Sequence, residues 1–130
     1  MDPAAPSLAP KHVIVLDDDL TWREIALAVL AKHGFAGIPA ATLDEALAAF
    51  DAGPVAVAIV DLVMPHNNGI QAITAIRKRD RGVAILGMSG SFGEYRAGGS
   101  AMRMAGAVEL LAKHAGPAAL AAVVVRLAGG

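Results

Sequence analysis

The feature that most constrains the fold is the alternation of short apolar runs with longer segments of helical periodicity. Five apolar runs occur, and each is followed by a segment long enough to hold a helix. Apolar runs that stop abruptly are typical of strands buried on both faces of a sheet. Because strands linked by helix-length crossovers pair in parallel, the sequence predicts an α/β fold with a doubly wound parallel sheet and five helices. The expected strands are residues 13–16, 37–41, 55–60, 83–88 and 107–111.

Local signals predict where several helices begin and end. Thr21 with Glu24, and Thr42 with Glu45, have the spacing of a capping box. Pro117 suits the first position of the last helix. The weakest candidate is a fourth helix after the fourth strand, where each glycine in a helix interior costs up to about 1 kcal/mol. Helices are therefore expected from about residues 20, 42, 69, 92 and 117.

Composition limits the class of protein. The chain has 130 residues, 55% hydrophobic and 18% charged, which indicates one folded domain over residues 12–128 after a flexible lead-in at 1–11. A net charge of −1 argues against a nucleic-acid surface, and the lack of cysteine excludes thiol catalysis and Cys-based zinc sites. No signal peptide or run of about 18 apolar residues is found, so a soluble, cytoplasmic domain without membrane insertion is expected.

Polar residues follow four of the five expected strands. Asp17 and Asp18 follow the first, Asp61 the third, Ser89 the fourth and Lys113 the fifth. In a doubly wound sheet, ligands bind at the carboxyl ends of the strands. Three carboxylates that converge there repel one another unless a cation lies between them, and Mg²⁺ prefers oxygen ligands. Together with a hydroxyl and an ammonium, this set suits the binding and transfer of a phosphoryl group.

Other polar and aromatic residues have simpler interpretations. Asp19 fits the N-cap of the first helix. Trp22 and Phe35 are expected to pack in the core, and His66 to be a solvated histidine on the loop after Asp61.

In combination, these segments resemble the receiver domain of two-component response regulators over about residues 12–128. The matching segments are residues 15–19, 60–65 with Gly69, 88–90, and 105–107 before Lys113. The resemblance implies a flavodoxin-like sheet of strand order 2-1-3-4-5. It also implies that Asp61 accepts a phosphoryl group from a phosphohistidine, with Ser89 and Lys113 binding the phosphoryl oxygens. Asp17, Asp18, Asp61 and the backbone carbonyl of Val63 would hold Mg²⁺.

The resemblance further implies what the chain works with. The partners would be a histidine kinase or a histidine phosphotransfer protein, and a downstream effector protein, with no nucleic acid. The chain would be a stand-alone receiver, or one cut from a longer protein, acting as a monomer or weak homodimer. It would not be an enzyme beyond its own phosphotransfer and autodephosphorylation.

Three departures from the receiver pattern carry expectations of their own. His114 follows the lysine where receivers usually have proline, so the Lys113–His114 bond is expected to be trans or locally strained. Leu110 occupies the position of the usual aromatic switch residue, which puts the coupling between that residue and Ser89 in doubt. The glycines of residues 92–105 indicate a mobile or shortened fourth helix.

Two alternatives stay open. One is a receiver-shaped interaction module that is never phosphorylated. The other is a haloacid-dehalogenase-type phosphatase, in which Asp17 would be the nucleophile and Asp19 the acid/base. The phosphatase alternative is weakened by the lack of a paired acidic motif after Ser89, where Glu94 and Glu109 are the only acids.

Overall fold

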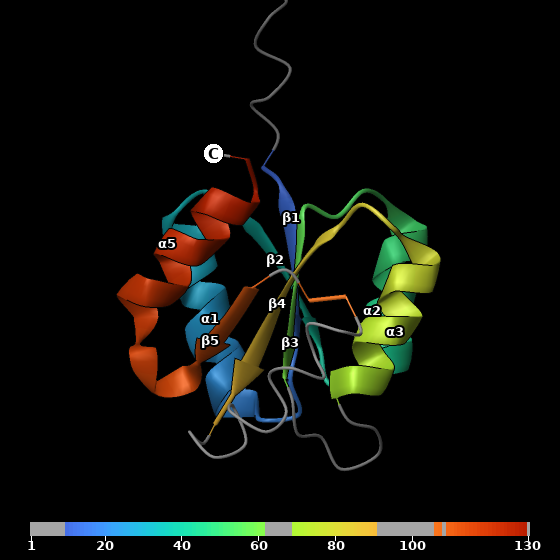
Figure 1. Ribbon diagram of the computed structural model, residues 1–130. Helices are drawn as coiled ribbons and strands as arrows, with labels where there is room; N and C mark the ends of the chain where they lie inside the picture. The colour runs from blue at the N-terminus through green and yellow to red at the C-terminus, as the bar shows by residue number, and fades with distance from the viewer. Residues whose placement is uncertain (1–9, 62–68, 91–105, 108, 130) are drawn as a thin grey trace, which may run out of the picture.

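Five parallel strands form one sheet of order β2-β1-β3-β4-β5 in the computed structural model, which describes residues 10–61, 69–90, 106, 107 and 109–129 (Figure 1). The fold class and the strand order predicted from the sequence are both confirmed. The fifth strand begins two residues later than expected, at Glu109. The strands are β1 (His12–Leu16), β2 (Ala36–Ala40), β3 (Val57–Asp61), β4 (Ala84–Ser89) and β5 (Glu109–Ala112).

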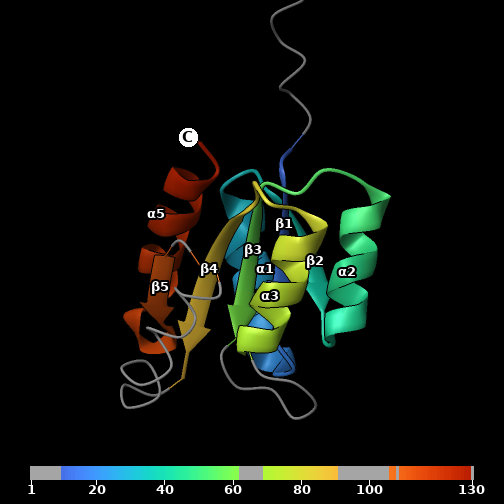
Figure 2. The same cartoon turned by 45° about the vertical axis from the view of Figure 1, so that its right-hand side comes forward.

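Helices cover both faces of this sheet, as a doubly wound fold requires. One pair lies on one face and the other pair on the opposite face (Figures 1 and 2). Of the five expected α-helices, four occur in the described residues, and the expected helix at 92–105 lies outside them. The first pair is α1 (Leu20–Lys32) and α5 (Pro117–Leu127); the second is α2 (Leu43–Ala52) and α3 (Gly69–Arg79).

Each face has its own hydrophobic core. Ile14, Val60 and Ile73 belong to the cluster under α2 and α3, whereas Val13, Ile59 and Leu120 belong to the cluster under α1 and α5. The two faces of one strand thus supply alternate residues to the two cores, because successive side chains of a strand point in opposite directions. This two-sided burial explains why the strands appear in the sequence as continuous apolar runs.

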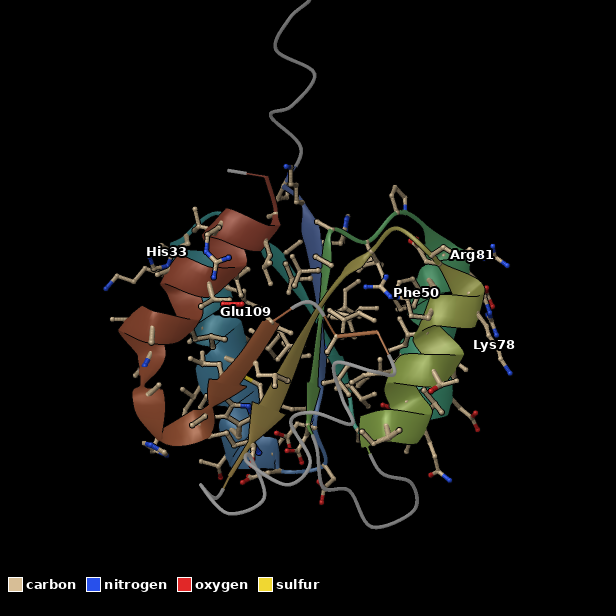
Figure 3. The ribbon with its side chains drawn as sticks, viewed as in Figure 1. His33, Phe50, Lys78, Arg81 and Glu109 are labelled. Atoms are coloured by element: carbon tan, nitrogen blue, oxygen red, sulfur yellow. The ribbon has the colours of Figure 1, made fainter. Side chains whose placement is uncertain are left out.

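Side chains at the periphery confirm this arrangement. Figure 3 places Phe50 beside α2 and α3, and it packs against the core of that face. Phe35 is half-buried against the other core, as predicted for a packing residue. Pro39 lies on β2, an edge strand, where the missing amide hydrogen of proline is tolerated.

No helix among the described residues is both long and apolar enough to cross a membrane.

The helix ends correct one prediction and confirm three. Asp19 is the N-cap of α1, and its carboxylate accepts a hydrogen bond from the backbone amide of Trp22. The predicted capping box at Thr21 is therefore wrong, because Thr21 lies inside a helix that has already begun. Thr42 caps α2 through the amide of Glu45, as expected, and Pro117 occupies the first turn of α5.

Candidate functional site

The register of the sheet brings the predicted site residues to one edge. Leu16 of β1 pairs with Val60 of β3, so Asp17 and Asp61 are the next residues on two adjacent strands. On the other side of β3, Asp61 pairs with Met88, and Ser89 follows Met88 directly. Each strand ends at nearly the same level, so one edge of the sheet collects the polar residues that follow the apolar runs.

The same register places Lys113 at this edge. Ser89 pairs with Ala112, so Lys113 is one residue past the end of β5 and begins a single 3₁₀ turn, η2 (Lys113–Ala115). Ser89 is buried, with 1% of its surface exposed. Asp17, Asp18, Asp61, Ser89 and Lys113 are thus all placed at the carboxyl edge of the sheet, where the sequence predicted them.

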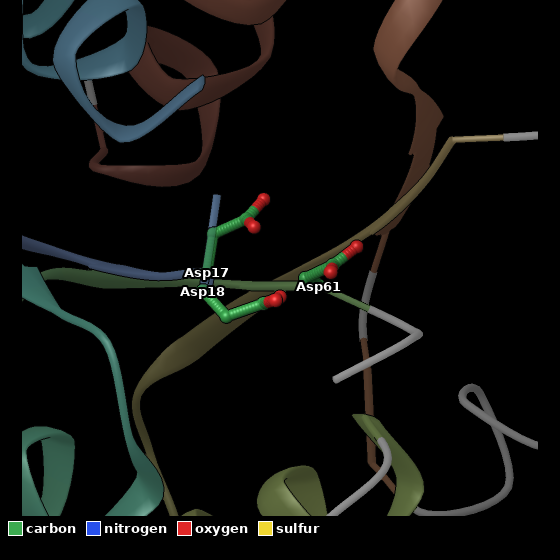
Figure 4. A group of neighbouring side chains, drawn as sticks. All are labelled: Asp17, Asp18 and Asp61. Carbon is green, nitrogen blue, oxygen red and sulfur yellow. The ribbon is translucent and has the colours of Figure 1, made fainter. Parts of the chain in front are cut away.

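Three carboxylates form a compact group at the edge. One oxygen from each of Asp17, Asp18 and Asp61 lies within 4.8 Å of the others (Figure 4). Asp17 and Asp61 are buried, with 1% and 6% of their surface exposed, and Asp18 is exposed. The group therefore has two fixed ligands and one that faces solvent. Val63, the fourth expected ligand, lies outside the described residues.

The donor set fits a hard divalent cation. All three side chains offer carboxylate oxygens, the ligand type that Mg²⁺ prefers, and an exposed carboxylate leaves room for the waters that Mg²⁺ retains. Oδ2 of Asp17 is buried and accepts no well-aligned hydrogen bond from the described residues, but it forms an ion pair with Lys113. A buried carboxylate oxygen with spare acceptor capacity is suited to a cation.

Lys113 supplies the positive charge that pairs with the carboxylates of this edge, within the described residues. Its Nζ lies 2.5 Å from Oδ2 of Asp17 and 3.5 Å from Oδ1 of Asp61, and 19% of its side chain is exposed. Burial alone would lower the pKa of Lys113. The contact with Asp17 and the charges of both aspartates outweigh burial and raise that pKa above its ordinary value. Lys113 is therefore firmly protonated.

The ammonium of Lys113 does not cancel the effects that raise the pKa of Asp61. Burial, followed by the negative charge of Asp17, raises the pKa of Asp61 from 3.8 to about 6, with a smaller contribution from Asp18. Lys113 opposes this rise through its charge and its hydrogen bond. The charged form of Asp61 is thus disfavoured, as expected where like charges share a buried site. The repulsion predicted from the sequence is present at this residue.

The turn from β1 to α1 holds Asp17 in place. Oδ1 of Asp17 accepts the backbone amide of Asp19 at 2.9 Å, and its backbone carbonyl accepts Nη1 of Arg23 at 2.8 Å. The role of Arg23 was not predicted, because a single arginine in a helical pattern gives no signal of which carbonyl it will reach. Asp19 itself is exposed, and its carboxylate is used as the N-cap of α1.

Two departures from the receiver pattern can be located. The Lys113–His114 bond is trans, because no cis bond occurs in the described parts of the chain, and His114 is exposed. This confirms the expectation for that bond. Leu110 is half-buried and packs against the core under α2 and α3. His66 and the glycine-rich segment 92–105 lie outside the described residues, so the expectations for them stay predictions.

Comparison with known proteins gives one family. Residues 13–125 match the family described as the response regulator receiver domain. The photosynthetic apparatus regulatory protein RegA of Cereibacter sphaeroides is 28% identical over 107 residues, which cover 82% of this chain and 57% of RegA. The chain thus spans less than two thirds of that relative.

Solved structures agree with this match. A response regulator from Chloroflexus aurantiacus, described as putative, is 27% identical, with a TM-score of 0.83 over 93% of this chain and 99% of that one. A response regulator protein from Burkholderia pseudomallei is 25% identical, with a TM-score of 0.80 over 92% of this chain and 69% of that one. The crystal structure of the Burkholderia pseudomallei protein has a phosphorylated aspartic acid, a calcium ion and citrate.

Proposed function

The chain belongs to the response regulator receiver domains, which accept phosphoryl groups in two-component signalling, and on this premise we propose that Asp61 is its phosphoryl acceptor. The observation that carries the proposal is the placement of Asp61. It is a buried carboxylate within ion-pair distance of Lys113, grouped with two further carboxylates at the carboxyl edge of the sheet. The phosphorylated aspartic acid of the Burkholderia pseudomallei protein supports the same chemistry here.

Asp17, Asp18 and Asp61 would hold Mg²⁺, with the carbonyl of Val63 as the further ligand that the family implies. When bound, the ion supplies positive charge that neutralises phosphoryl oxygens. The fit of the donor set supports this assignment, as does the calcium ion of the Burkholderia pseudomallei protein. Asp17 is firmly held, because Oδ1 and the backbone carbonyl each accept a hydrogen bond.

The chain's own residues divide the remaining work. An oxygen of Asp61 attacks phosphorus, the P–N bond to the donor imidazole breaks as the P–O bond forms, and the imidazole leaves with the bonding electron pair. Lys113 provides a fixed charge for the transferred oxygens, and Ser89 provides a hydroxyl beside them. Phosphoryl transfer depends mainly on such positioning and charge compensation.

We assign the phosphodonor to a histidine kinase or a histidine phosphotransfer protein, and the output to contacts with an effector protein. In this proposal the chain catalyses only its own phosphotransfer and dephosphorylation. Phosphotransfer profiling against purified histidine kinases identifies the donor, and a panel without any transfer would contradict the assignment.

The direct test of Asp61 is labelling with acetyl phosphate and Mg²⁺, followed by intact-protein mass spectrometry. We expect one phosphoryl group that is removed by hydroxylamine, as an acyl phosphate should be. Asp61→Asn should abolish the label, while Asp51→Asn, an exposed aspartate of α2, should keep it. A wild-type chain that stays unlabelled with Mg²⁺ would favour the alternative of a receiver-shaped module that is never phosphorylated.

A further inference from the structure

An aromatic ring lies against the ammonium of the site. Trp22, the one tryptophan of the chain, lies in the first turn of α1, and Nζ of Lys113 is 5.5 Å from the centroid of its ring. A cation within about 6 Å of an indole ring is attracted by the negative potential of its face. Lys113 is therefore held by two kinds of partner, the carboxylates of Asp17 and Asp61 and the ring of Trp22.

We propose that Trp22 is a positioning residue for Lys113, and that its ring keeps the ammonium at the carboxylate edge. The proposal rests on the role of Lys113 in the proposed function. It concerns how this chain places the lysine, since the lysine is followed here by an exposed histidine rather than by the proline usual in receivers.

The backbone of Trp22 is well fixed for such a role. Its amide donates to the carboxylate of Asp19 at 3.2 Å, and Asp19 in turn donates its amide to Asp17 at 2.9 Å. The next residue, Arg23, is bonded to the carbonyl of Asp17. The turn that fixes the metal-binding carboxylate thus also fixes the ring that contacts Lys113.

The buried N–H of the indole ring indicates that the face of the ring is the useful part of Trp22. Nε1 of Trp22 is buried and has no hydrogen-bond partner among the described residues, and the side chain is half-buried against the core under α1 and α5. Burying an unpaired N–H costs free energy, and an aliphatic residue or phenylalanine would fill this position without that cost. The aromatic face toward Lys113 is the property that tryptophan offers in return, because indole binds cations best of the aromatic side chains.

Lys113 has a reason to need such a contact. It has a long, flexible side chain and begins a short 3₁₀ turn at the end of the shortest strand, β5. Both carboxylates that hold it are also candidate ligands of the metal, so their pull on the ammonium weakens when a divalent cation shares them. The ring of Trp22 is not a metal ligand, so its contact with Lys113 does not compete with the metal.

The test uses the fact that the sequence contains one tryptophan. Biosynthetic replacement by fluorinated tryptophans of increasing fluorine number weakens the cation–π attraction stepwise while keeping the ring shape. We expect the rate constant for labelling by acetyl phosphate, at saturating Mg²⁺, to fall about two- to fivefold across the series. The free energy of unfolding should change little. A rate that is independent of fluorination would overturn the proposal.

Two variants and one spectroscopic measurement complete the test. Trp22→Leu should lower the labelling rate by a similar factor, Trp22→Phe should restore most of it, and Phe35→Leu should leave it unchanged because Phe35 belongs to the same core without being the ring on Lys113. An equal loss in Phe35→Leu would mean general loosening of the core and would overturn the proposal.

The spectroscopic measurement needs no phosphorylation. In nuclear magnetic resonance spectra of the metal-free protein, the side-chain protons of Lys113 should carry an upfield ring-current shift that Trp22→Leu removes. If the wild-type chain is never labelled, the proposed function fails, while this shift still decides whether Trp22 holds the lysine. Lys113 shifts that are identical in both proteins would overturn the positioning role.

Discussion

Lys113 pairs most closely with Asp17: its Nζ lies 2.5 Å from Oδ2 of Asp17, a full ångström nearer than its distance to Asp61. One ammonium thus faces two buried carboxylates and an exposed third, Asp18. Removal of one partner of a buried ion pair strongly destabilises a protein, because it leaves a buried charge uncompensated. An excess buried charge carries the same cost. The metal-free site therefore carries an excess of negative charge, which contributes to the raised pKa of Asp61.

The first prediction concerns the stability of the metal-free protein. The pKa of Asp61 is raised to about 6 in the folded state, against 3.8 as the reference for the unfolded state. Between these two pH values the folded protein therefore binds more protons than the unfolded protein. Below about pH 4 Asp61 is protonated in both states and costs no stability. The free energy of unfolding then falls as the pH rises toward 6. Asp61→Asn should be more stable than wild type by about 3 kcal/mol above pH 6, and equally stable near pH 4.

Urea denaturation in a chelator, over this pH range, measures the difference. Glu24→Gln, at an exposed position of α1, controls for the loss of one negative charge. A difference between Asp61→Asn and wild type that does not depend on pH would contradict the excess of negative charge at this site.

The second prediction concerns metal removal by acid. Binding of Mg²⁺ requires Asp61 to be ionised, so the apparent affinity should fall about tenfold for each pH unit below about 6 and level off above it. Isothermal titration calorimetry on either side of that pH measures this dependence. Lys113→Met should move the fall in affinity to higher pH, because Lys113 lowers the pKa of Asp61. An affinity that is flat through pH 6 in wild type would be inconsistent with the raised pKa.

The third prediction concerns the side chain of Arg77 in α3, which anchors the backbone at Gly106. Nε and Nη2 of Arg77 donate to the carbonyl of Gly106 at 3.1 and 2.8 Å, and Nη1 donates to the carbonyls of Arg81 and Val83. Gly106 has φ +128, and an added Cβ would lie 2.7 Å from Cγ of Arg77. Gly106→Ala should therefore disturb the anchor as well as strain the backbone.

Gly34→Ala is the matched control for this anchor, because Gly34 also has a positive φ, of 83°, but a Cβ added there would have open space around it. We expect Gly34→Ala to cost about 1 kcal/mol of unfolding free energy, and Gly106→Ala to cost clearly more. Arg77→Lys should lose about 2 kcal/mol, since an ammonium cannot span these carbonyls as a guanidinium does. Equal costs at both glycines, by urea denaturation, would show that contact with Arg77 is unimportant.

The fourth prediction separates the receiver from a phosphatase of the haloacid-dehalogenase type. Asp19 caps α1, so Asp19→Ala should cost about 1 kcal/mol of stability, and Asp19→Asn much less. Both variants should still be labelled on Asp61 by acetyl phosphate. Hydrolysis of aryl phosphates that depends on Asp19 would instead support the phosphatase alternative.

The sheet and the site could be predicted from the sequence because both depend on residues that are neighbours in the chain. Each buried strand is a continuous apolar run, and the polar residue that ends it is next in the chain, so Asp61 and Ser89 could be placed from strand ends alone. Thr21 was misplaced as a cap because Asp19, two residues earlier, competes for the same role. Local patterns do not decide between two adequate caps.

What could not be predicted depends on side chains that meet across the fold. The contact of Trp22 with Lys113 joins residues far apart in the sequence, and so does the anchor of Arg77 on Gly106. Trp22 was expected only to pack, which is correct but incomplete. A long side chain can reach many partners, and periodicity carries no information about which one it meets.

The described chain enters the sheet beside the place where it leaves α5. Nζ of Lys11, just before β1, donates to the carbonyl of Ala128, just after α5, at the sheet edge opposite Asp61 (Figure 1). For anyone who builds a sensor from this domain, that geometry is convenient. A fluorophore, a reporter domain or a surface tether attached near Lys11 or Ala128 would lie away from the carboxylates. A tether attached near Lys11 or Ala128 would leave the carboxylate edge facing the solution.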